Sequence, residues 1–180
     1  RVTGNSAAIL SVGSCDITVR QAGGENYLAA NPVTETVTVS IPLPEIEVAS
    51  SETRGGVETL TWLTSGASQN LSGVAYNRTR TYNYTIRNAG QIPLTGLVLS
   101  MGGANPVDFP IMFWSGQTSL EPGQRANFSV RLAPTSSGAK AGILSISSND
   151  GDENPFLVNF TGYGTGCYPP VLTSSIFISG

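Results

Sequence analysis

Short runs in which apolar and polar residues alternate recur along almost the whole chain, separated by glycine, proline, asparagine or aspartate. A period of two places alternate side chains on opposite faces of an extended backbone, so each run is typical of a half-buried β-strand. The clearest run covers residues 80–88, in which Tyr82, Tyr84 and Ile86 share one face. Such strands at regular spacing predict an all-β protein made of antiparallel β-sandwiches. The strands predicted for the main block cover residues 45–49, 60–63, 80–88, 94–100, 109–114, 126–132, 143–147 and 155–162.

The arrangement of these runs divides the chain into four parts. Residues 1–41 hold only two or three strands, too few for an independent core, and are expected to be an incomplete sandwich. Residues 42–44 form a predicted hinge, because two prolines restrict the backbone and interrupt any strand ladder. Residues 45–164 are expected to be one complete sandwich. Residues 165–180 are a predicted linker followed by one extra terminal strand.

The first block resembles a bacterial Ig-like repeat that occurs in tandem in secreted and surface proteins. The likeness lies in residues 2–4, 12–18, 21–27 and 33–39, where a cysteine-containing strand and a Gln-Ala-Gly…Asn-Tyr loop occur together at the family spacing. The front half of the family's domain has no counterpart here. The resemblance implies a partial bacterial Ig-like domain over residues 1–41.

The main block resembles the choice-of-anchor D module, a bacterial Ig-like sandwich related to hydin-like domains. The likeness lies in residues 44–48, 84–90, 120–123, 132–135 and 147–164, in the family's order. It implies an Ig-like sandwich and a place in a long secreted or cell-surface protein. A fold of this kind hosts many unrelated roles, so it implies little more about function.

Charge and composition exclude several function classes. The chain has 9 Lys and Arg against 12 Asp and Glu, a net charge of −3, which argues against nucleic acid and anionic membrane surfaces as partners. No apolar run approaches the ~20 residues of a membrane helix, so membrane insertion is not expected. The chain lacks histidine, and its acidic pairs, Glu45 with Glu47 and Asp150 with Asp152, are explained by solvation. No catalytic residue and no enzyme activity are predicted.

Cys15 and Cys167 are the only cysteines. Two cysteines in separate segments of a chain without histidine do not provide the four ligands of a structural zinc site. In the Ig-like repeats that the first block resembles, the equivalent of Cys15 usually pairs with a cysteine that would precede Arg1 here. Three states stay open: a bridge to Cys167 of the same chain, a bridge to Cys167 of a neighbouring chain, and two free thiols. An oxidising exterior favours a bridge.

Oxygen-bearing side chains are crowded into residues 149–154, among them Asn149, Asp150, Asp152 and Asn154. Calcium prefers oxygen ligands, so these residues are a weak candidate calcium site. The same residue types build tight turns, and the segment lacks the downstream glutamate of an EF-hand. A hairpin loop without a metal is the simpler interpretation, and no other cofactor is predicted.

Phe113 and Trp114 are the candidate exposed interaction residues. Neighbouring side chains of an extended strand point to opposite faces, so one of the two is expected to be exposed. Most other aromatic residues alternate with polar ones and are expected to fill the core. The alternative function is therefore an adhesion or accessory module of a larger multidomain surface protein, which binds a glycan or protein ligand.

The last strand carries the candidate assembly residues: Val171, Leu172, Ile176, Phe177 and Ile178. Left unpaired, this strand would expose apolar side chains and a free edge. The lead hypothesis is that residues 167–180 of one copy complete residues 1–41 of the next, which gives a head-to-tail filament of identical subunits by donor-strand complementation. In the other interpretation the chain is a piece of a longer protein, and the tail begins the next Ig-like domain. Both interpretations predict a structural protein outside the cell or on its surface.

Overall fold

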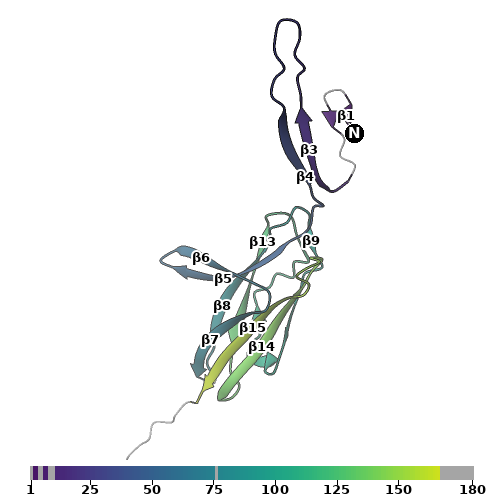
Figure 1. Cartoon of the computed structure of the whole chain (residues 1–180). Coiled ribbons are helices and arrows are strands. Elements are labelled where there is room, and N and C mark those ends of the chain that lie inside the picture. The colour runs from purple at the N-terminus through teal and green to yellow at the C-terminus, as the bar shows by residue number, and fades with distance from the viewer. Residues whose placement is uncertain (1, 4–5, 8–10, 76, 167–180) are drawn as a thin grey trace, which may run out of the picture. The chain divides into compact units, whose positions relative to one another are not determined.

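The computed structural model describes residues 2–3, 6–7, 11–75 and 77–166 (Figure 1). Within these residues the only helix is the short 3₁₀ turn η1 (Pro106–Asp108), and no helix has the length and apolar character needed to span a bilayer. The all-β class predicted from the alternation is confirmed. The chain divides into two compact units, Arg1–Pro42 and Leu43–Gly180, and the division falls within the predicted proline hinge. We call them the N-terminal unit and the C-terminal unit.

The N-terminal unit consists of two antiparallel pairs. β1 (Val2–Thr3) pairs with β2 (Ser6–Ala7), and β3 (Gly13–Val19) pairs with β4 (Val33–Val39) in a longer hairpin. Its register sets Cys15 opposite Val37 and Val19 opposite Val33. Directly opposed residues of an antiparallel pair share a face, so this register gathers like side chains on each side of the hairpin.

One side of the β3–β4 hairpin is a ladder of polar side chains. Three hydrogen bonds cross it: Ser14 to Thr38 (3.0 Å), Thr18 to Thr34 (2.9 Å), and Thr36 to the carboxylate of Asp16 (2.6 Å). Cross-strand pairs of this type contribute about 0.2–1 kcal/mol each. The hairpin therefore has a defined register and a clear difference between its two faces.

The C-terminal unit is a sandwich of two main sheets (Figure 1). The first sheet consists, in spatial order, of β11 (Ile111–Met112), β13 (Arg125–Leu132), β8 (Arg80–Asn88), β5 (Ile46–Arg54) and β6 (Val57–Leu63). The second consists of β10 (Val98–Gly102), β14 (Gly138–Ser147), β15 (Phe156–Thr165) and β7 (Ala67–Ala75). A short pair joins β9 (Leu94–Thr95) to β12 (Ser119–Leu120). All these pairings are antiparallel, as predicted, except that of β15 with β7, which is parallel.

Aromatic rings fill the space between the two sheets. The ring of Tyr84 stacks on Phe128 at 5.4 Å between centroids and meets Phe160 edge-on at 5.6 Å. Phe109 stacks on Phe160 at 6.2 Å. All four side chains are at most 1% exposed. Truncating a buried ring of this kind typically costs about 3–5 kcal/mol, so these rings stabilise the sandwich as one unit.

The strands that alternate strictly are the ones that the sequence predicted. In β8, Tyr84 and Ile86 are fully buried and Tyr82 packs against the core. β7 was missed because its alternation of apolar and polar residues is broken. Its two buried residues, Leu71 and Val74, are three apart, and between them Ser72 has a φ of +62° at a register shift.

A buried ion pair explains a lysine at a core-facing position of β14. The Nζ atom of Lys140 lies 3.2 Å from Oδ2 of Asp108, and both side chains are at most 5% exposed. Oδ1 of Asp108 accepts hydrogen bonds from the backbone N–H (2.9 Å) and the hydroxyl (2.8 Å) of Thr135, and Lys140 donates to the hydroxyl of Ser136 (2.7 Å). The pair joins η1, the loop after β13 and β14.

Candidate functional site

Three carboxylates from distant parts of the sequence meet at one end of the C-terminal unit. Glu45 directly precedes β5, whereas Asp150 and Asp152 lie in the loop between β14 and β15. One oxygen atom from each residue lies within 4.8 Å of those of the other two. We call these three residues the acidic cluster. Sequence reasoning missed Glu45, because only the pairing of β5 within the folded sheet brings it near the loop.

Of the four candidate calcium ligands, Asp150 and Asp152 belong to the acidic cluster. The amide oxygen of Asn149 accepts a hydrogen bond from the backbone of Thr95 (2.7 Å), and that of Asn154 accepts one from the backbone of Ser148 (3.1 Å). The two asparagines therefore fix the loop, as expected of turn residues, and are not members of the acidic cluster.

Asp150 is the buried member of the acidic cluster, 1% exposed. Its Oδ2 accepts a hydrogen bond from the backbone N–H of Ile46 (2.8 Å), while its Oδ1 is buried without a hydrogen-bond partner among the described residues. Burial, followed by the negative charges of Asp150 and Asp152, raises the pKa of Glu45. The same causes raise the pKa of Glu153. This end of the sandwich thus concentrates negative charge.

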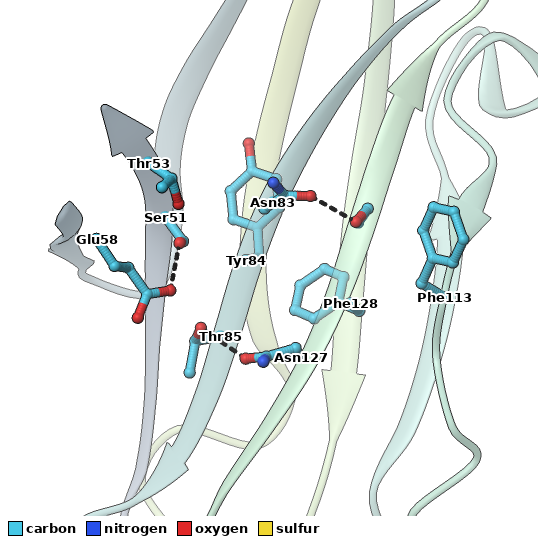
Figure 2. Close-up of a pocket in the computed structure, with 10 residues that line it drawn as sticks. Ser51, Thr53, Glu58, Asn83, Tyr84, Thr85, Phe113, Asn127 and Phe128 are labelled. Carbon is cyan, nitrogen blue, oxygen red and sulfur yellow. Dashed lines mark hydrogen bonds between the residues drawn. The ribbon is translucent and has the colours of Figure 1, made fainter. Parts of the chain in front are cut away.

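A shallow depression of about 310 Å³ lies over β5, β8 and β13, on the sheet face opposite the core (Figure 2). Hydroxyl and amide groups line it in mutually bonded pairs. Ser129 donates to Asn83 (2.8 Å), Thr85 donates to Asn127 (2.8 Å), and Ser51 donates to Glu58 (2.6 Å). These bonds engage the amide oxygens of Asn83 and Asn127 and leave the NH2 groups of both asparagines as donors on the depression.

Phe113 stands at one side of this depression, across from Ser51 and Glu58 (Figure 2). It is 75% exposed and has a φ of +57°, whereas its neighbour Trp114 packs against the core. The structure therefore exposes Phe113 of the candidate pair. The predicted strand 109–114 is reduced to Ile111–Met112, because η1 precedes it and the left-handed backbone at Phe113 ends it.

The second side of the β3–β4 hairpin is apolar. We call this side the apolar hairpin face; its residues are Cys15, Ile17, Val19, Val33, Val37 and Val39, with Glu35 among them. Every residue of β3 and all but Val39 in β4 are exposed, Val19 to 67% and Val33 to 59%. Nothing in the described part of the chain covers this face. The candidate partner Cys167 and the candidate assembly residues Val171, Leu172, Ile176, Phe177 and Ile178 lie outside the described residues.

No family model and no curated protein matches this sequence. Similar solved structures exist. A protein of unknown function from Porphyromonas gingivalis W83 is 13% identical with a TM-score of 0.50, over 87% of this chain and 68% of that one. The seventh PapD-like (ASH) domain of human CEP192 is 12% identical with a TM-score of 0.50, over 73% of this chain and 92% of that one. At this identity the likeness concerns the fold alone, which is an Ig-like or PapD-like β-sandwich.

Proposed function

We propose that this chain is a non-catalytic structural module of a secreted or cell-surface bacterial protein, with a choice-of-anchor D type sandwich over residues 45–164. Its N-terminal unit receives strands from a neighbour. The neighbour that we propose is a second copy, whose residues 171–178 complete the β3–β4 hairpin and so build a head-to-tail filament. The observation that carries this proposal is the apolar hairpin face, which lies in solvent in the described chain.

The exposed side chains make a lone hairpin unfavourable. A two-stranded hairpin in water is marginally stable at best, and it needs further strands or a packed layer. Burying a valine or isoleucine side chain contributes about 1.5–3 kcal/mol, so covering Ile17, Val19, Val33 and Val37 supplies a large driving force for association. A partner strand also satisfies the free edge of the hairpin.

The sequence of the last segment suits this role. Alternation from residue 171 places Leu172, Ser174, Ile176 and Ile178 on one side, and Val171, Thr173, Ser175 and Phe177 on the other. Two prolines, a residue type that favours an extended backbone, precede the segment at 169–170. The side with Leu172, Ile176 and Ile178 is the more apolar of the two and complements the apolar hairpin face, which is the chemistry of donor-strand complementation.

Light scattering after size-exclusion chromatography tests the proposal over a concentration series. We expect the full chain to form concentration-dependent oligomers and a chain without residues 167–180 to stay monomeric. Ile17→Lys places a charge on the apolar hairpin face and should abolish assembly. Thr18→Lys, the matched control on the polar side, should retain it. A full chain that stays monomeric, or a truncated chain that assembles equally well, contradicts strand complementation by this segment.

The exposed Phe113 beside the depression supports a second candidate, binding of a glycan or protein ligand. An exposed aromatic ring at the edge of a polar surface is a stacking platform for sugars. A glycan array probed with the full chain tests this candidate. Phe113→Ala should lose any signal, whereas Val107→Ala, which removes a similarly exposed apolar side chain (74%), should keep it.

A further inference from the structure

We propose that Glu45, Asp150 and Asp152 bind a divalent metal ion, and that the ion is calcium. Their oxygen atoms converge within 4.8 Å of one another from two separate segments of the chain. A divalent cation bound between them would join the start of β5 to the β14–β15 loop. The site lies within the C-terminal unit and is independent of any assembly of subunits.

The buried carboxylate of Asp150 is the observation that points to a ligand. The side chain is 1% exposed, one oxygen accepts the Ile46 N–H, and the other is buried without a partner among the described residues. A buried ionised carboxylate with an unsatisfied oxygen is costly. None of the ion pairs formed by described residues includes Asp150. A cation would satisfy the free oxygen and balance its charge.

Surrounding negative charge adds a second reason for a cation. The oxygen atoms of three carboxylates lie within 4.8 Å of one another, so these groups repel one another when they are ionised, and Glu153 adds a further carboxylate to the same loop. Arg87 of β8, which lies opposite Glu47 near the start of β5, already donates a hydrogen bond of 2.7 Å to the Glu47 carboxylate. A divalent cation bound between the three carboxylates would relieve their mutual repulsion.

The loop that carries the two aspartates is held before any metal binds. The backbone N–H of Asn149 donates to the carbonyl of Thr95 (2.9 Å), and the backbone N–H of Asp150 donates to the hydroxyl of Ser148 (3.2 Å). With the asparagine bonds described above, these contacts fix the loop against β9 and keep its carboxylates near Glu45. Such preorganisation lowers the ordering cost of binding.

The ligand chemistry favours calcium over other divalent ions. The three candidate ligands are all carboxylates, without the nitrogen or sulfur ligands that select zinc. Calcium accepts six to eight oxygens in irregular geometry, whereas magnesium demands a near-ideal octahedron. Asp152 is exposed and Glu45 partly so, which leaves room for water ligands. We therefore expect an affinity in the range of extracellular modules, with Kd on the order of 0.1–1 mM.

Thermal unfolding of the full chain at constant ionic strength, followed by tryptophan fluorescence, tests the site. Calcium at about ten times its Kd should raise the Tm by about 4 °C, and magnesium should act much more weakly. Asp152→Asn and Glu45→Gln should each weaken calcium binding, measured by isothermal titration calorimetry, by about tenfold or more. Glu52→Gln, at an exposed position near the far end of β5, should bind as the parent does.

Two results would overturn the proposal. One is a parent chain that shows neither heat nor a Tm shift with calcium in the millimolar range. The other is a calcium effect without specificity: the parent and the Asp152→Asn and Glu45→Gln variants respond equally to calcium, or the parent responds to magnesium as strongly as to calcium. Either finding would reduce the effect to general charge screening. Both substitutions lie at partly or fully exposed positions, so loss of folding is not expected to obscure the comparison.

Discussion

Replacing Lys140 by methionine is expected to destabilise the C-terminal unit strongly, because it leaves a carboxylate buried without its counter-charge. The side chains of Lys140 and Asp108 are 5% and 2% exposed, so water does not replace the lost partner. Asp108 keeps its two hydrogen bonds from Thr135 but loses the ammonium group 3.2 Å away. Breaking one partner of such a buried pair costs about 3–5 kcal/mol. A domain has about 5–15 kcal/mol of stability in total, so this loss is a large fraction.

Urea unfolding of the full chain measures this cost. Both tryptophans lie in the C-terminal unit and Trp114 packs against its core, so fluorescence reports that unit. With a urea slope of roughly 2 kcal/mol per molar, the midpoint of Lys140→Met should fall by about 2 M. Arg54→Met, which breaks an exposed ion pair with Glu52, is the control and should leave the midpoint unchanged.

A double-mutant cycle separates a shielded ion pair from two independent effects. Asp108→Asn alone leaves the ammonium of Lys140 buried beside Ser136 and should also cost about 3–5 kcal/mol. The double variant removes both charges, so we expect it to lose less than the sum of the single losses. Additive losses, or a Lys140→Met cost below about 1 kcal/mol, the range of exposed pairs, would refute the reasoning.

Two further predictions concern the same region. Burial opposes ionisation of Asp108, but the hydrogen bonds from Thr135 and the charge of Lys140 outweigh it and lower the pKa of this carboxyl. The ionised Asp108 carboxylate therefore stabilises the fold fully above its unfolded-state pKa of about 3.9, and this stabilisation is lost as the pH falls through its lower folded-state pKa. The urea midpoint should accordingly fall more steeply below about pH 4 in the parent than in the Asp108→Asn/Lys140→Met variant. Gly164→Ala should lower the urea midpoint markedly, because its Cβ would overlap the carbonyl oxygen of Ser136, while Gly166→Ala, with nothing within 4 Å, should not change it.

The sequence predicted those strands whose pattern reflects one buried and one exposed face. β8 and β13 follow this rule, because Tyr84, Ile86, Phe128 and Val130 all point into the core. β7 escaped prediction because its hydrogen bonds come from β15, which lies far along the chain, and because only two of its residues, Leu71 and Val74, are buried. Alternation in the sequence reflects the burial of side chains on one face. A strand held mainly by backbone hydrogen bonds to its neighbour shows little alternation.

The candidate sites, like the strands, could be predicted from the sequence only in part. Residues 149–154 stood out by local composition, yet composition did not separate the residues that fix the turn, Asn149 and Asn154, from those in the acidic cluster. Glu45 joins the cluster only through the fold. The sequence indicated that one of Phe113 and Trp114 is exposed. Which of them is exposed depends on the left-handed backbone at Phe113, which ends the strand.

The paths of the first and last long strands of the sandwich have a mechanical consequence. β5 lies between β8 and β6, β15 lies between β14 and β7, and the hydrogen bond from Ile46 to Asp150 sets the start of β5 beside the loop that leads into β15. The chain thus enters the C-terminal unit at one end and leaves β15 at the other (Figure 1). A pulling force between these points runs along both strands and loads their flanking hydrogen bonds in shear, all at once, instead of peeling them one by one. Such a unit is suited to bear tension.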